Sequence, residues 1–362
     1  MATNDGYSKL LDVALDEWYN ENDIQNMSFA NRTITTMASK WIERKNCGKQ
    51  FRSKHALGRN TSYKGFGPRD TFNTSSFGSF PEGLWEMKEH VITLDIPDQE
   101  KIYNNNEYGI LDLAKFYTET TDKSLADSLG DDWLLSNGEG DDGKRGHGFA
   151  LLFGDATSDA GRKVGDMLAS QYPFHQAVIK RPSLTLPVIN LRDPMAAWTT
   201  AADTSLDVTN PFDSGDTDPW QLFTLDGMDE YLALQQTLGN DVTWCITTDK
   251  IFRRVKKLIR ASDGNLQTVT LSSGTISVPK IQAINYQGVI FTWDYMVPDG
   301  EMYFGNDSNI KIRVHADAWL RKFPSQRPHN QGVDYGYIYA WWQMYTNKRN
   351  ALGRWTKVSH KA

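Results

Sequence analysis

Apolar and aromatic residues occupy almost every position near the end of the chain, in the segment YIYAWWQMYT at 337–346. Successive side chains of a strand point to opposite faces, and here neither face is polar. Six aromatic residues lie between Tyr335 and Tyr345, and each can bury about 150–250 Å². Monomers seldom expose apolar patches beyond a few hundred Å². We therefore expect this strand to be covered on both faces.

A long helical pattern covers residues 107–136. Its apolar stripe recurs at helical spacing over several turns, at Ile110, Ala114, Tyr117, Thr121, Leu125, Leu129 and Trp133. Ser136-Asn137-Gly138 follows as a C-terminal stop. A helix of this length needs a long partner beside it, and the aromatic strand is the candidate.

Other patterns predict a mixture of helices and strands without internal repeats. We expect helices within 8–45, the second from Phe29 to about Lys45, and a strand over 87–97. Between 146 and 314 the patterns predict strands at 148–155 and 242–249, helices at 219–239 and 248–264, and two strands around the turn Pro298-Asp299-Gly300. Extended structure continues through 309–320.

Residues 48–86 are rich in glycine and polar residues, with single aromatics and little capacity for a core. Residues 49–81 contain six basic residues and one acidic residue, Asp70, which gives this segment a net charge of +5. The remainder of the chain therefore carries a net charge of −11. A segment this long with weak structure is usually functional or disordered. The alternatives are a surface loop and a projecting hairpin that becomes ordered on a partner. The aromatics favour the hairpin.

Composition excludes several classes of protein. The net charge of −6 argues against a general nucleic-acid binder, and no apolar run approaches the ~20 residues that span a bilayer. The start lacks a signal-peptide pattern, so we expect a chain that is intracellular when made. With only Cys47 and Cys245, a disulfide framework or a four-cysteine zinc site is excluded, and buried free thiols are expected.

No motif predicts catalysis, a cofactor or a metal. Residues 138–145 (GEGDDGKR) approach a phosphate-binding loop, but Arg145 stands where a hydroxyl should hold magnesium; a solvated turn is the better interpretation. Asp213, Asp216 and Asp218 lack the spacing of a calcium loop. The basic helix at 250–260 predicts a solvated face, with a lattice or polyanion contact as the alternative. We expect a protein that is not an enzyme.

Three fragments together resemble the major capsid proteins of tailed bacteriophages. The first runs from Gly288 through Asp294 and the Pro298–Gly300 turn to Met302-Tyr303-Phe304 and Asn306. The second lies near the end of the chain and consists of Asn347-Lys348-Arg349-Asn350 with Gly353. The third consists of Phe80, Trp85 and Lys88 at the start of the 87–97 strand, followed by ILDLAK. Their order spans about residues 50 to 358.

The resemblance implies an α+β fold shared with herpesvirus capsid floors and encapsulin shells. It assigns 1–47 to an N-terminal arm with helices, 48–86 to an extended two-stranded loop, and 87–145 to a peripheral domain with a spine helix at 107–136. Residues 146–314 would form mainly an axial α/β domain, and 315–362 would return as C-terminal strands to the peripheral and axial sheets.

The implied function is a structural shell subunit that assembles into hexamers and pentamers around double-stranded DNA, in a virion capsid built in the host cytoplasm. Portal, scaffolding and decoration proteins are the further partners implied. Arg349 is expected to pair with carboxylates at a sheet end. The candidate contacts between subunits are Lys49, Arg52, Lys54, Arg59, Tyr63, Lys64, Phe66, Arg69, Phe72, Phe77, Lys348 and Arg349.

Two other functions remain open on the sequence. The 12 Trp and 15 Tyr residues suit a carbohydrate-binding or carbohydrate-active protein, which would need an aromatic groove with paired carboxylates. A tail or connector component of a virion is the other alternative.

Overall fold

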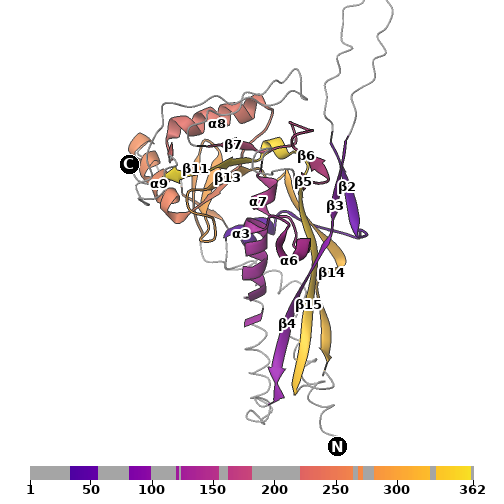
Figure 1. The fold of residues 1–362 in the computed structure, drawn as a ribbon. Coiled ribbons are helices and arrows are strands. Elements are labelled where there is room, and N and C mark those ends of the chain that lie inside the picture. Colours follow the sequence, from indigo (N-terminus) through magenta and orange to yellow (C-terminus); the bar gives the residue numbers. More distant parts are fainter. Residues whose placement is uncertain are drawn as a thin grey trace, which may run out of the picture.

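The computed structural model of the chain describes residues 33–55, 81–98, 120–121, 124–154, 162–181, 221–263, 268–271, 281–326 and 332–359. A long, narrow four-stranded sheet with a helix along it joins a broader seven-stranded sheet that carries two further helices (Figure 1). The expected helix before residue 29, most of the loop, the first half of the spine helix and the acidic segment 213–218 lie outside the described residues.

The aromatic strand β15 (Val333–Thr346) lies inside the four-stranded sheet. The order is β1 (Ile42–Lys45), β14 (Ile310–Gln326), β15 and β4 (Lys88–Pro97). β1 runs parallel to β14 and the other pairs are antiparallel. Strand pairing on both sides satisfies the backbone of β15, so the predicted strand is confirmed and its two faces remain to be covered.

One face of β15 packs against the helix at 124–135. Ile338, Ala340, Trp342 and Met344 are buried on this face. The helix supplies Leu125, Leu129 and Trp133, three positions of the predicted stripe, and the rings of Trp133 and Trp342 meet edge to face at 6.0 Å. The expected pairing of long helix and aromatic strand is confirmed for the described part of the helix.

The other face of β15 carries a row of half-buried aromatics. Tyr335, Tyr337 and Tyr339 alternate along it, with ring centroids 6.3 Å and 5.3 Å apart in succession. Phe323 of β14 stacks on Tyr337 at 4.8 Å. Val91 of β4 is 52% exposed beside this row. The outer face is therefore an aromatic surface that is only partly covered.

The seven-stranded sheet has the order β10 (Thr268–Leu271), β11 (Ile281–Tyr286), β12 (Val289–Trp293), β9 (Trp244–Thr247), β13 (Met302–Gly305), β16 (Gly353–Trp355) and β7 (Val178–Lys180). β12 and β9 are parallel, as are β16 and β7, and the remaining pairs are antiparallel. The strands predicted around the Pro298 turn are confirmed, and β9 lies between them.

Alternation along the strands divides the core between the two faces of this sheet. Cys245 and Phe304 point into a core covered by α8 (Leu225–Thr237) and α9 (Asp249–Asp263). Trp244, Ile246 and Tyr303 point into the core shared with the four-stranded sheet. The predicted burial of the thiols is confirmed for Cys245, whereas Cys47 is only partly buried. Both helices therefore cover the same outer face.

Two of the predicted elements are wrong. Residues 148–155 form not a strand but the short helix α7 (Phe149–Leu152), because a short buried apolar run has the same pattern in either structure. Within the described residues, the predicted helix from Phe29 to Lys45 ends at Ala38 as α3 (Thr33–Ala38), and its last part becomes β1. Hydrogen bonding to β14 outweighs the local helical pattern there. The part of the expected arm from residue 33 onward is thus packed into the body.

Shorter elements complete the chain. The segment 138–145 contains the turn α6 (Gly140–Gly143), with positive φ at Asp141 and Asp142, as expected of a solvated turn. The remaining elements are β2 (Gln50–Lys54), β3 (Glu82–Glu86), β5 (Lys163–Val164), β6 (Met167–Leu168), β8 (Gln221–Leu222), the 3-10 turn η1 (Arg349–Ala351) and β17 (Val358–Ser359).

Replacing Gly353 tests the packing of α8 on the sheet. A Cβ at this position would lie 1.7 Å from the hydroxyl oxygen of Tyr231, which is fully buried. We expect Gly353→Ala to lower the free energy of unfolding by about 3 kcal/mol or more, measured by urea denaturation. Gly48→Ala is the control, because nothing lies within 4 Å of its added Cβ. Equal stability of the two variants would contradict this packing.

Candidate assembly surface

The base of the 48–86 loop is a two-stranded ribbon. β2 and β3 pair antiparallel from Gln50 opposite Glu86 to Lys54 opposite Glu82, and the His55 amide donates to the Pro81 carbonyl at 3.1 Å. Phe51 and Ser53 are buried while Arg52 and Lys54 are exposed. Seven of the candidate contact residues lie beyond this ribbon, outside the described residues: Arg59, Tyr63, Lys64, Phe66, Arg69, Phe72 and Phe77.

One side of the ribbon is anchored on the four-stranded sheet by Phe51. Its ring meets Tyr345 edge to face at 5.0 Å, and the Arg313 guanidinium lies 4.3 Å from its centre. Arg313 is held in turn by Glu43 at 3.5 Å and by the Tyr345 hydroxyl at 3.2 Å. A cation between two rings strengthens the contact when it is shielded from water. The polar alternation of residues 50–54 was the sequence signal for this anchor.

The other side is anchored by a chain of hydrogen bonds. His55 Nδ1 lies 3.1 Å from the Asn347 carbonyl, so it must carry the proton, and Nε2 accepts from the Ser53 hydroxyl at 2.8 Å. Ser53 Oγ accepts from Trp85 Nε1 at 2.7 Å. Burial lowers the pKa of His55, which favours this neutral form. The chain ties the loop base to the turn after β15.

Two of the candidate cations are paired inside the ribbon. Lys49 Nζ lies 3.4 Å from Glu86, and Arg52 Nη1 lies 3.0 Å from Glu82. Both glutamates follow residue 81, where the charge count ended, so the net charge over 49–86 is +3. Exposed pairs of this kind contribute little to stability. Lys54 is exposed and is the described loop cation without an ion pair.

Lys348 lies over the end of α8. Its Nζ donates to the carbonyl of Gly239 at 3.2 Å and lies 3.5 Å from that of Leu238. These carbonyls follow the last residue of the helix, where backbone acceptors lack intrahelical partners. Partial burial lowers the pKa of the Lys348 ammonium. The side chain therefore acts as a C-terminal cap, which is a favourable place for a cation.

Arg349 is inside the protein, which corrects its expected contact with a second subunit. It is 1% exposed, so its side chain is not placed for direct contact with another copy. The guanidinium donates to three backbone carbonyls: Leu151 at 2.7 Å, Leu152 at 2.9 Å and His175 at 3.1 Å. The first two are carbonyls at the end of α7. The basic turn thus caps two helices with two consecutive side chains.

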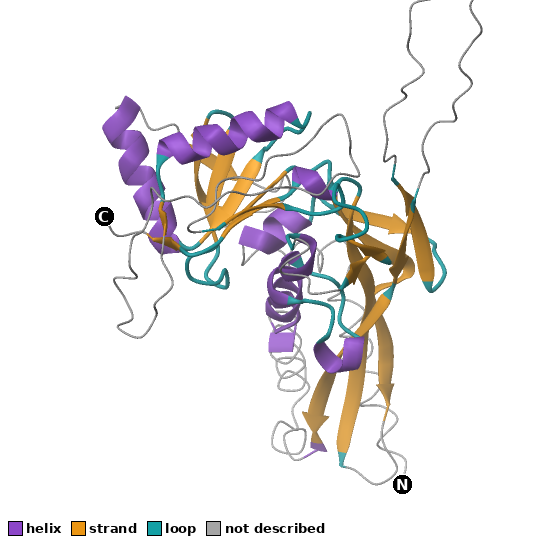
Figure 2. Cartoon of the chain, turned by 45° about the horizontal axis from the view of Figure 1, so that its top comes forward, coloured by secondary structure: helices purple, strands orange, loops and turns teal. Residues whose placement is uncertain are grey.

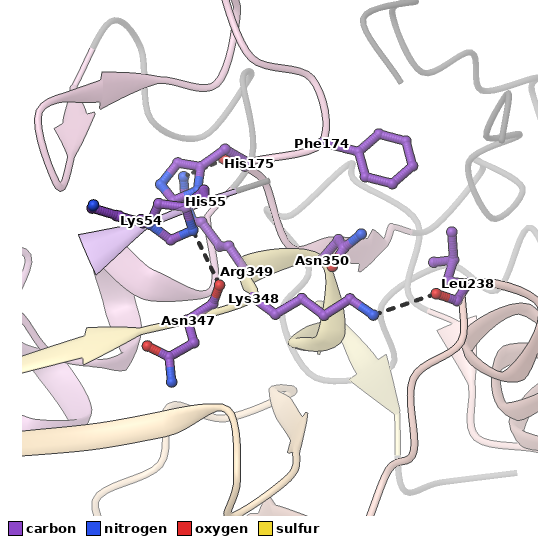
Figure 3. Close-up of a pocket in the computed structure, with 9 residues that line it drawn as sticks. All are labelled: Lys54, His55, Phe174, His175, Leu238, Asn347, Lys348, Arg349 and Asn350. Carbon is purple, nitrogen blue, oxygen red and sulfur yellow. Dashed lines mark hydrogen bonds between the residues drawn. The ribbon is translucent and has the colours of Figure 1, made fainter. Parts of the chain in front are cut away.

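A pocket of about 350 Å³ lies where the loop base, this turn and the end of α8 meet (Figure 3). His55 and His175 lie edge to face at 5.3 Å, and burial lowers the pKa of both. The lining residues are Lys54, His55, Phe174, His175, Leu238, Asn347, Lys348, Arg349 and Asn350. None of these described lining residues is a carboxylate, so they do not supply the paired acids that glycoside hydrolysis needs.

The described residues contain no group of side chains suited to a metal ion. Among the same residues, no helix has the length and apolar composition to cross a membrane.

Comparison with known proteins places the fold. No protein-family model and no curated protein matches the sequence. Among solved structures, a chain of the cyanophage A-1(L) capsid asymmetric unit matches with a TM-score of 0.62 and 11% identity, covering 90% of this chain and 92% of that chain. A native GTA particle capsid gives 0.54 and 11%, covering 90% and 91%. The capsid of Myoviridae phage XM1 gives 0.53 and 11%, covering 90% and 92%. The predicted phage capsid fold is confirmed.

The Arg349 cap predicts a large loss of stability on truncation. Arg349→Met leaves three carbonyls without their donor, and we expect a loss of about 3 kcal/mol or more in the free energy of unfolding. Lys348→Met, which removes the neighbouring and partly exposed cap, should cost about 1 kcal/mol. Urea denaturation of both variants measures the difference. A smaller loss at Arg349 than at Lys348 would refute the assignment.

Because of its buried histidines, we expect the protein to have a lower free energy of unfolding in mild acid. Burial lowers the pKa of His147 to about 4 and of His175 to about 3, from the ordinary 6.5 that they regain on unfolding. Their contribution is full above 6.5 and falls as pH drops, by up to about 1.4 kcal/mol per pH unit for each.

One carboxyl opposes this trend, since burial raises the pKa of Asp132 to about 6 and so favours the fold at lower pH. Burial also lowers the pKa of His90 to about 4, so three histidines act against one aspartate, and we expect the free energy of unfolding to fall between pH 6.5 and pH 5 by about 2–4 kcal/mol. Denaturant titrations at both pH values give the comparison; a rise in stability toward pH 5 would contradict it.

Proposed function

We propose that this protein is the major capsid subunit of a tailed bacteriophage. It acts as a structural component without a catalytic reaction, and many copies assemble through hexamers and pentamers into an icosahedral-type shell around double-stranded DNA. The observation that carries the proposal is the match to capsid chains over about nine-tenths of its length. At about one-tenth identity, that match concerns the fold, and function rests on the surfaces described above.

Two surfaces support assembly. The loop base is fixed at Phe51 and His55 on the chain's own body, so residues 56–80 start from a fixed base. Residues 56–80 carry cations and aromatics but little core-forming pattern, a composition suited to covering a neighbouring subunit. The aromatic row of β15 at Tyr335, Tyr337 and Tyr339 is a second surface that a neighbour can cover.

The proposed partners follow from this role. Identical copies of the chain are the principal ones. Portal and scaffolding proteins, a decoration protein and the packaged DNA are further partners of such a shell. The protein would be assembled in the host cytoplasm and reside in the virion capsid.

Assembly of the purified protein tests the proposal directly. We expect shells, capsomers or polydisperse assemblies in sedimentation velocity and in negatively stained electron micrographs. Tubes or single rings would favour a tail or connector component instead. A species that stays monomeric at high concentration would refute the shell function.

Removing the loop separates assembly from folding. Replacing residues 56–80 with a short Gly-Ser linker keeps the ribbon and both anchors, because Phe51 and His55 remain. We expect a folded subunit with near-normal thermal stability that no longer forms shells. Lys49→Gln with Arg52→Gln is the control, since both cations are already paired within the chain and should leave assembly largely intact. Normal shells from the loop deletion would contradict this use of the loop.

A further inference from the structure

The helix α9 presents a cationic surface that the carboxylates of the described residues neutralise only in part. It holds six basic and two acidic residues. Arg253 pairs with Asp249 at 2.6 Å and Lys250 with Asp299 at 3.0 Å. For the other four, no carboxylate of the described residues lies within the 4.0 Å of an ion pair: Arg254, Lys256, Lys257 and Arg260. Lys257 and Arg260 are exposed.

The helix α8 has the opposite character. It holds three acidic residues and no basic one, and Asp226, Asp229 and Glu230 are all exposed. Asp229 accepts hydrogen bonds from the neutral donors Tyr286 and Gln287 at 2.9 Å and 3.0 Å. Lys180 reaches Glu230 only at 3.8 Å. No described cation forms an ion pair with Asp226.

The two helices lie in one layer of the same domain. Met228 and Tyr231 of α8, and Ile251 and Val255 of α9, are buried in the same core. α8 runs along the seven-stranded sheet, and α9 lies at the end remote from the four-stranded sheet (Figure 2). Among the described residues no ion pair joins α8 to α9. The layer therefore exposes a cationic patch on α9 and an anionic patch on α8, and no ion pair between described residues links the two.

We propose that the cationic side of α9 binds the acidic side of α8 on a neighbouring copy of this chain. This rests on the proposed function and names a charged contact between adjacent shell subunits. Because each copy carries both patches, the contact is head-to-tail and can repeat until a ring closes. Complementary charges of this kind orient subunits and speed their encounter.

A nucleic acid fits the same layer less well. Phosphates attracted to α9 would meet the three carboxylates of α8 on the same face, and the chain as a whole carries a net charge of −6. Repulsion from like charge is costly at close range. A second copy avoids this conflict, because its α8 supplies the carboxylates and its own α9 remains available to the next copy.

A charge-reversal cycle tests the contact. Lys257→Glu with Arg260→Glu should slow assembly at about 0.05 M salt by about tenfold, followed by light scattering and electron microscopy. Adding Asp226→Lys and Glu230→Lys to the same chain restores opposite charges across the contact and should recover most of the rate. Raising the salt to about 0.5 M should narrow the gap between wild type and the first variant.

Controls make each outcome decisive. Lys40→Glu with Lys144→Glu gives the same change in net charge at exposed positions away from both helices and should assemble at the wild-type rate. Circular dichroism confirms that each variant is folded. Normal assembly of the α9 variant, with or without loss of binding to a short DNA duplex, overturns the contact while the shell function stands. A wild-type chain that never assembles overturns both.

Discussion

The buried guanidinium of Arg349 connects the two halves of the molecule. It follows β15 of the four-stranded sheet and precedes β16 of the seven-stranded sheet, and it donates to carbonyls of α7 and His175 between them. A buried charge is tolerated only when its donors are satisfied, so the positions of α7 and the turn constrain each other. This constraint and the core that the two sheets share together fix the turn that joins them.

The base of the extended loop contacts the same turn between β15 and β16. His55 reaches the Asn347 carbonyl, two residues before Arg349, and Phe51 packs on Tyr345 at the end of β15. The ribbon therefore has a defined direction from the body, because Phe51 and Trp85 at its base are buried in the core. The direction of the loop is therefore linked to the turn between the two sheets, on which the loop base rests. In the proposed function, this link would orient the loop toward a neighbouring subunit.

Charge is arranged differently from what the sequence count indicates. The excess of positive charge in the loop is partly neutralised by Glu82 and Glu86 on its second strand. The helix α9 keeps a cationic surface and α8 an acidic one. The proposed contacts of opposite charge between copies therefore have two sources, the loop and the helix layer. In the loop base the two signs largely pair with each other, whereas α9 and α8 form no ion pair with each other in the described residues, so one copy could contact a different neighbour through each helix.

Local pattern determined much of this protein. The helical stripe at Leu125, Leu129 and Trp133, the helices α8 and α9, and the long aromatic strand all follow from periodicity, because burial on one face repeats with the geometry of the element. The order of weak motifs also indicated the capsid fold. Tertiary structure decided what periodicity leaves ambiguous. The short apolar run at 149–152 became a helix that packs on Trp244 and is capped by Arg349. Ile42–Lys45 became a strand because it pairs with Ile312–His315, far along the chain. Arg349 had the sequence of a surface cation, yet its burial depends on three carbonyls from distant segments, and no local pattern encodes where such acceptors converge.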